Sequence, residues 1–131
     1  VRLEAPQGLG VCALAGIPRN ARITAQIVPQ QQSAEFGCRL RATDLLDSGY
    51  ALAFSPYEAQ AQLHDQALTA VHGLGQPFTL EVILWEDIID VCIAGQRTII
   101  NRCPAQQGER LLLYARNADV TWRDIEVRPI L

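Results

Sequence analysis

The stretch that decides the fold is Thr79–Arg97, which reads TLEVILWEDIIDVCIAGQR. It predicts two strands joined by a tight turn at Glu86-Asp87, with a second turn at Gly95. With that turn, three apolar pairs share one side of the hairpin: Leu84 with Ile89, Val82 with Val91, and Leu80 with Ile93. A slip of one residue would turn every apolar side chain to the wrong face, so matched pairs of this kind fix the register.

Working outward, short extended segments recur along the chain with turn residues between them, which predicts an all-β protein. A helical alternative covers Ser55–Leu68, but its polar and apolar residues alternate at period two, which favours strands. We expect a two-sheet antiparallel β-sandwich, a jelly roll, because so many strands in a short chain must stack in two layers. The eleven expected strands lie near Gly10–Ala15, Ala21–Val28, Ala34–Ala42, Tyr50–Ser55, Ala59–His64, Ala67–Val71, Phe78–Trp85, Ile88–Ala94, Thr98–Cys103, Arg110–Arg116 and Val120–Val127.

Length and charge bound the function. The 131 residues suggest one domain over positions 1–131 that buries a core of its own. The net charge of −3 argues against a nucleic-acid partner, and no apolar run is long enough to span a membrane. The chain begins Val1-Arg2 without an initiator methionine, so we expect a mature product or a module of a larger protein.

Motifs for catalysis, metals or cofactors are absent. Only His64 and His72 are available as bases, and neither stands beside a candidate nucleophile. The four cysteines, Cys12, Cys38, Cys92 and Cys103, match no zinc spacing, and we expect reduced thiols. Because no pair of carboxylates has a context that would separate their pKa values, we expect no catalysis by the chain itself. Asp44 and Asp47 could bind calcium, but no full calcium loop appears, and we expect no cofactor or metal.

The segment Glu35–Arg41 is the best candidate for a ligand site. In an extended strand Glu35, Gly37, Arg39 and Arg41 share one face, and the glycine leaves space above the backbone. The alternative is a solvated, salt-paired sheet face. Two interpretations are also open for each of two aromatic residues. Tyr50 either caps the core or offers its hydroxyl to a ligand, and Trp85 either caps a turn or stacks on a sugar ring.

Several segments carry a family resemblance, namely Asp47–Leu52, Phe78–Leu84, Ile89–Gly95, Arg102–Pro104 and Val120–Pro129. From Glu35 to Leu131 the chain resembles concanavalin-like modules and, more closely, the C-terminal β-sandwich of glycoside hydrolase family 32, the fructan and sucrose hydrolases. Related modules of carbohydrate-binding family 66 recognise the terminal fructose of levan. The resemblance implies an accessory module, because that family's active site lies in a separate β-propeller whose acidic motifs are absent here.

Two functions therefore compete. The first is a non-catalytic carbohydrate-binding module for fructans or β-fructosides, attached to a catalytic β-propeller, with Glu35, Arg39, Arg41, Tyr50 and Trp85 as candidate ligand residues. The second is a structural sandwich that packs on a catalytic domain through the outer hairpin face, which carries Ile83, Ile88 and Cys92. A small self-sufficient enzyme is a third possibility, disfavoured by the missing acid–base pair. Secretion or cytoplasmic location would follow the parent enzyme.

Overall fold

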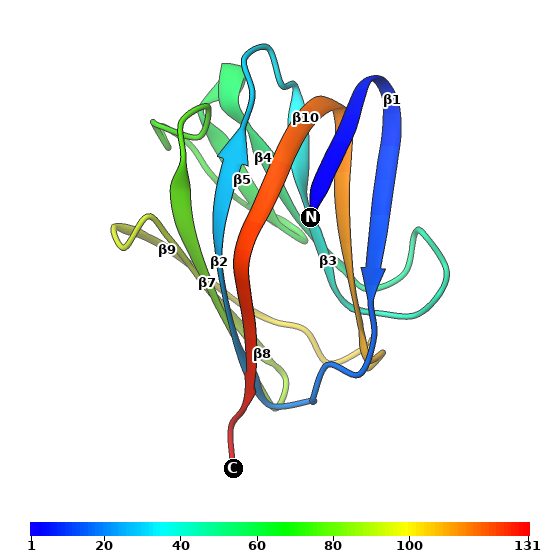
Figure 1. The fold of residues 1–131 in the computed structure, drawn as a ribbon. Helices are drawn as coiled ribbons and strands as arrows, with labels where there is room; N and C mark the ends of the chain where they lie inside the picture. The colour runs from blue at the N-terminus through cyan, green and yellow to red at the C-terminus, as the bar shows by residue number, and fades with distance from the viewer.

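The computed structural model describes all 131 residues, and β-strands make up most of the chain (Figure 1). One short 3-10 turn, η1 at Pro56–Glu58, is the only helical element. The ten strands are β1 Arg2–Leu14, β2 Ala21–Pro29, β3 Glu35–Ala42, β4 Tyr50–Ser55, β5 Gln60–Leu63, β6 Gln66–Leu68, β7 Phe78–Trp85, β8 Ile88–Ile93, β9 Arg97–Arg102 and β10 Arg110–Pro129.

The strands form two antiparallel layers that share β1 and β10. The first half of β10 pairs with β3, and its second half pairs with β2, so the chain follows one strand from layer to layer. The first layer runs β6-β5-β4-β3-β10, and the second runs β10-β2-β7-β8-β9. The strand β1 accompanies β10 along both halves, with a register shift between Ala5 and Leu9. Figure 1 shows both strands folding over the upper end of the sandwich, which confirms the expected fold class.

The opening hairpin has the predicted register. Leu80, Val82 and Leu84 of β7 pair with Ile93, Val91 and Ile89 of β8, and all six side chains are buried. Between the layers they join a core of 29 residues that includes Trp122. Phe54 packs against Phe36 and Phe78, with ring centroids 5.7 and 5.2 Å apart. Alternate burial on these strands therefore leaves two outer sheet faces available for function.

Two strand predictions were wrong. Arg110–Arg116 and Val120–Val127 are halves of the continuous β10, because Asn117 bends the chain with a φ of 48° without ending the pairing. The first strand begins at Arg2 rather than near Gly10, because its Pro6–Gly8 stretch sits in the register shift opposite the β10 bend. The segment Ser55–Leu68 forms η1, β5 and β6, as the period-two pattern favours.

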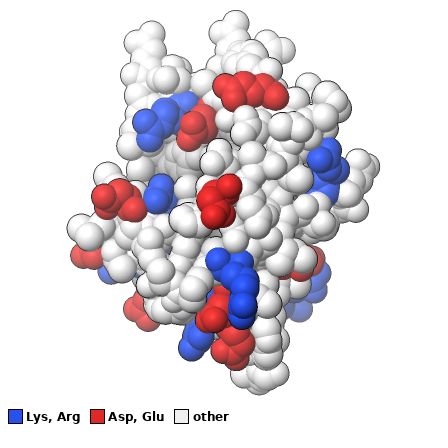
Figure 2. Space-filling model, turned by 180° about the vertical axis from the view of Figure 1, so that it is seen from behind, with Lys and Arg blue, Asp and Glu red and all other residues white.

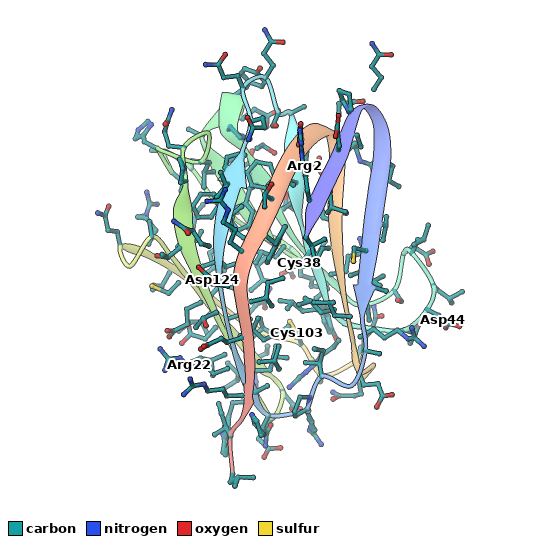
Figure 3. The ribbon with its side chains drawn as sticks, in the orientation of Figure 1. Arg2, Arg22, Cys38, Asp44, Cys103 and Asp124 are labelled. Carbon is teal, nitrogen blue, oxygen red and sulfur yellow. The ribbon has the colours of Figure 1, made fainter.

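All four cysteines are free thiols. Cys38 and Cys103 are fully buried in the interior (Figure 3), and burial raises the thiol pKa to about 12 for Cys38 and about 11 for Cys103. Cys92 pairs with Thr98 across β8 and β9, as the hairpin register predicts. No helix is long and apolar enough to cross a membrane.

Charged side chains are mixed in sign over the surface. The face in Figure 2 carries arginines beside aspartates and glutamates, with no extended area of one sign. Several form exposed ion pairs, of which the shortest is Arg22 with Glu81 at 2.6 Å. Pairs this exposed contribute little to stability, so the fold depends on the core between the layers.

Candidate functional site

A trough on the outer face of the first layer is the best candidate site. Small residues form its floor, where Gly37 of β3 pairs with Ala53 of β4 and Arg39 pairs with Ala51. Larger side chains rise on both sides and enclose about 280 Å³. That volume lies just below the usual range for ligand pockets, about 300–1,000 Å³. The lining residues are Leu9, Val11, Glu35, Arg39, Leu46, Ala51, Ala53, Gln62, His64, Leu112, Tyr114 and Arg116.

Strand register brings these residues together from five strands. One cross-strand row contains Leu9 of β1, Arg116 of β10 and Glu35 of β3. The next row contains Val11, Tyr114, Gly37, Ala53 and Gln62. Because alternate residues of a strand share one face, the same alternation that fills the core places all of these side chains on the outer face.

Glu35 is the carboxylate of the trough, and Tyr114 holds it in place. The Tyr114 hydroxyl donates a 2.8 Å hydrogen bond to Oε2 of Glu35. Burial, together with the neighbouring Glu35 charge, raises the pKa of Tyr114 well above its ordinary value, so the hydroxyl stays protonated and keeps donating. Oε1 of Glu35 makes no hydrogen bond within the protein and remains free to accept one from a ligand.

Arg39 joins the trough to the loop between β3 and β4. Its Nε donates to the Ser48 carbonyl at 2.6 Å, and its Nη2 donates to the Asp47 carbonyl at 3.0 Å. These bonds hold the loop that carries the exposed Leu46, one of the lining residues, and Asp44, which projects away from the sandwich in Figure 3. No carboxylate lies within ion-pair distance of Arg39 or Arg116, so two cationic groups line the trough without counter-ions.

The two walls of the trough differ in character. On the β5 side the Gln62 amide donates to the His64 carbonyl at 3.0 Å, and His64 has a φ of 55°. On the β1 side Leu9 and Val11 are apolar yet 50% and 38% exposed. An apolar wall facing a polar wall across a floor of small residues suits a ligand with one apolar and one polar face.

The structure brings only part of the predicted ligand set together. Glu35 and Arg39 line the trough, as the alternation predicts. The expectation that Arg41 shares their face was wrong, because β3 has a bulge where Arg110 and Leu112 oppose Ala42 and Arg39. Arg41 takes a φ of 53° there and points inward, only 3% exposed.

The aromatic candidates also lie outside the trough. Tyr50 is buried, and its hydroxyl accepts a 2.8 Å hydrogen bond from the Gln106 backbone N–H, so it caps the core. Trp85 is half-exposed at the end of β7, on the outer face of the other layer. Gly37 does not create open space, since a Cβ there would overlap the Leu52 carbonyl; it permits close approach of β3 and β4.

Sequence reasoning missed the contributions of Tyr114, Arg116, Gln62 and His64. A signal existed for the last two, which alternate with buried Ala61 and Leu63 along β5. No local signal connects Tyr114 with Glu35, because 79 residues separate them and only the pairing of β10 with β3 makes them neighbours.

The outer face of the second layer carries several isoleucines among polar side chains. Ile83 pairs with Asp90, which pairs with Ile100, and Ile88 lies between Trp85 and Arg102. Ile88 is 38% exposed and Ile100 is 56% exposed. As predicted, Ile83, Ile88 and Cys92 share this face, and polar side chains such as Glu81, Asp90 and Thr98 lie beside them.

Taken together, these features define an antiparallel β-sandwich with a small polar trough on one face. The structure is similar to the carbohydrate-binding module CBM66 from Bacillus subtilis, with a TM-score of 0.73, 8% identity, and coverage of 93% of this chain and 83% of the module. It is also similar to the Caenorhabditis elegans galectin LEC-6, with a TM-score of 0.65, 17% identity, and coverage of 97% and 95%.

Enzymes appear among the similar structures too. An alginate lyase of polysaccharide lyase family 7, AlgAT5, has a TM-score of 0.65 at 10% identity, over 92% of this chain and 63% of the lyase. No protein-family model matches the chain, and no curated protein matches its sequence. At these identities the likeness shows a shared fold, which several kinds of protein use.

Proposed function

We propose that the protein binds carbohydrate in the trough of the first layer. The observation that carries this proposal is the trough itself, where Glu35, Arg39 and Arg116 surround a floor of small residues opposite an apolar wall. A sugar has the matching chemistry, since its hydroxyls both donate and accept hydrogen bonds and its ring carries apolar C–H faces. The similarity to a carbohydrate-binding module and to galectins supports the same conclusion.

The charged groups of the trough make different hydrogen bonds to the sugar. Glu35 accepts hydrogen bonds from sugar hydroxyls through the oxygen that Tyr114 leaves free. Arg39 and Arg116 donate to hydroxyl and ring oxygens, and hydrogen bonds that involve such charged groups are worth about 1.5–3 kcal/mol each. Leu9 and Val11 cover the apolar side of the ring.

The trough supports binding rather than cleavage. Glu35 is the single carboxylate among its lining residues, whereas glycoside hydrolysis ordinarily uses two carboxylates about 5–10 Å apart. We therefore propose a non-catalytic accessory module. For the ligand we propose a fructan or another β-fructoside, because the sequence resembles the sandwich of fructan hydrolases and the structure resembles CBM66.

Titration of the domain with levan, inulin, fructose, lactose and alginate oligosaccharides tests this function. We expect saturable heat with the fructosides and amide shift changes in β3, β4 and β10. The Glu35→Gln variant should lose at least about tenfold in affinity, since it replaces a charged acceptor. The matched control is Glu58→Gln, which alters an exposed glutamate of η1 outside the trough. No response to any fructoside refutes the ligand class, and no response to any sugar refutes the function.

A specific observation supports a second role, which is docking. Ile83, Ile88, Cys92 and the more exposed Ile100 lie around Asp90 on the outer face of the second layer, and we call these four residues the apolar strip. We propose that a catalytic β-propeller of the parent protein covers this strip. Ile83→Asp should then release the module from the parent enzyme while sugar binding in the trough persists. Unchanged association between the two domains contradicts this role.

A further inference from the structure

A second pocket, distinct from the trough, surrounds Arg41 at the end of the sandwich where β1, β3 and β10 begin or end. It encloses about 370 Å³ between the β1–β2 loop and the loop that precedes β10. These two loops lie next to each other at the lower end of the molecule in Figure 1. The lining residues are Gly16, Ile17, Pro18, Arg19, Arg41, Gln107, Gly108 and Glu109.

The side chain of Arg41 is buried without a counter-ion. The residue is 3% exposed, and no carboxylate lies within ion-pair distance of it. Its Nη2 donates to the Arg19 carbonyl at 3.0 Å, while Nε and Nη1 are buried with no hydrogen-bond partner. Burying an unpaired charge and unsatisfied donors is costly, so a native protein keeps such a group where an acceptor can reach it.

A second cation stands at the same pocket. Arg19 is half-exposed, and its only ion pairs are long ones to Glu86 at 3.5 Å and Asp87 at 3.7 Å. Burial lowers the pKa of Arg41, and so does repulsion from Arg19, with smaller opposing influences from Cys103, Asp87 and Tyr50. Two arginines and one carboxylate, Glu109, line the pocket, so its formal side-chain charge is 2 − 1 = +1, although the chain as a whole has a net charge of −3.

Backbone contacts hold the pocket in shape. The Gly108 N–H donates to the Arg41 carbonyl at 3.2 Å, and the Ile17 N–H donates to the Glu109 carbonyl at 2.8 Å. A Cβ at Gly108 would overlap the Ala42 carbonyl, so the loop lies pressed against the β3 bulge. The bulge that turns Arg41 inward is thus supported from outside, as a preorganised binding group requires.

We propose that this pocket binds a small oxyanion, a carboxylate or phosphate group, between Arg41 and Arg19. Guanidinium groups match both oxyanions in charge and hydrogen-bond geometry. The anion would supply acceptors to a guanidinium that lacks them and would separate the two positive charges. This site is independent of the sugar trough, because the β3 bulge places Arg39 and Arg41 on opposite faces of the sheet.

The test is an NMR titration of the intact chain with inorganic phosphate, with sodium acetate and with sodium chloride, at constant ionic strength. The readouts are the Arg41 side-chain Nε–H resonance and the amides of Ile17 and Gly108. We expect saturable shifts with phosphate, with acetate or with both, and none with chloride. Saturation by phosphate alone or acetate alone assigns the group as a phosphate or a carboxylate. Shifts that match those of chloride overturn the proposal.

Variants separate binding at Arg41 from general charge effects. Arg41→Gln should weaken the preferred anion at least about tenfold, because it removes charge-assisted hydrogen bonds. Arg19→Gln, at an exposed position that leaves the core intact, should weaken it severalfold and serves if Arg41→Gln does not fold. Arg123→Gln is the control, since Arg123 is exposed, unpaired and on β10 away from the pocket. Undiminished binding in Arg19→Gln and Arg41→Gln, or equal weakening in Arg123→Gln, refutes the site.

Discussion

At the scale of the residue, the trough depends on the absence of a side chain. At Gly37 the backbone of β3 lies close against β4, and a Cβ there would overlap the Leu52 carbonyl. Gly37→Ala should therefore destabilise the fold by about 3 kcal/mol or more in urea unfolding, because backbone rather than a flexible side chain must move. Gly8→Ala is the control: a Cβ at Gly8 meets nothing within 4 Å, so its unfolding midpoint should hardly move. Equal effects of the two substitutions contradict this explanation.

The charged residues of β3 show which parts of the site the sequence alone could predict. Glu35 and Arg39 are placed correctly by simple alternation, which needs only their positions along one strand. Arg41 follows the same alternation in sequence, yet the bulge opposite Arg110 and Leu112 turns it inward. A bulge is a property of two paired strands, so the spacing within β3 alone does not contain it.

At the scale of the element, β10 joins the two layers by bending rather than breaking. Asn117 takes a φ of 48°, a conformation that asparagine tolerates and that a β-branched residue resists. Asn117→Val should destabilise the protein by about 1–3 kcal/mol in urea unfolding, whereas Asn117→Gly should be close to neutral. Equal stability of the two variants would show that the bend does not require a left-handed residue.

The ends of a strand, like the bulge in β3, depend on how the strand pairs with its neighbours. The β7–β8 hairpin was predictable in full register because its determinants, a two-residue turn and three apolar pairs, lie within fourteen residues. The continuity of β10 was not predictable, because pairing with the strands on either side decides whether the bend at Asn117 ends the strand. The place of Tyr114 in the site was also not predictable, because it depends on pairing with β3, whose Glu35 lies 79 residues earlier in the sequence.

At the scale of the whole molecule, the absence of lysine leaves few groups that titrate in mild alkali. Lysine is missing from the sequence and arginine keeps its charge, so thiols and phenols carry nearly all of the titration between pH 8.5 and 10.5. Two of those thiols, Cys38 and Cys103, lie in the core, where burial raises their pKa from 9.0 to about 12 and about 11. The phenol of Tyr114 is shifted in the same direction by burial. These groups ionise in the unfolded chain at a pH at which the folded protein keeps them neutral.

The stability of the sandwich should therefore fall as the pH rises through this window. Above the unfolded thiol pKa the unfolded state binds fewer protons than the folded state, so each added pH unit favours unfolding by up to about 1.4 kcal/mol per group. We expect the urea unfolding free energy to drop by about 2–4 kcal/mol between pH 8.5 and 10.5. The decline should be shallower in Cys38→Ala, which lacks one buried thiol, and unchanged in Cys12→Ser, which alters a half-exposed one. A flat profile in the unaltered protein would mean that the two core thiols are accessible to hydroxide and that the layers separate readily.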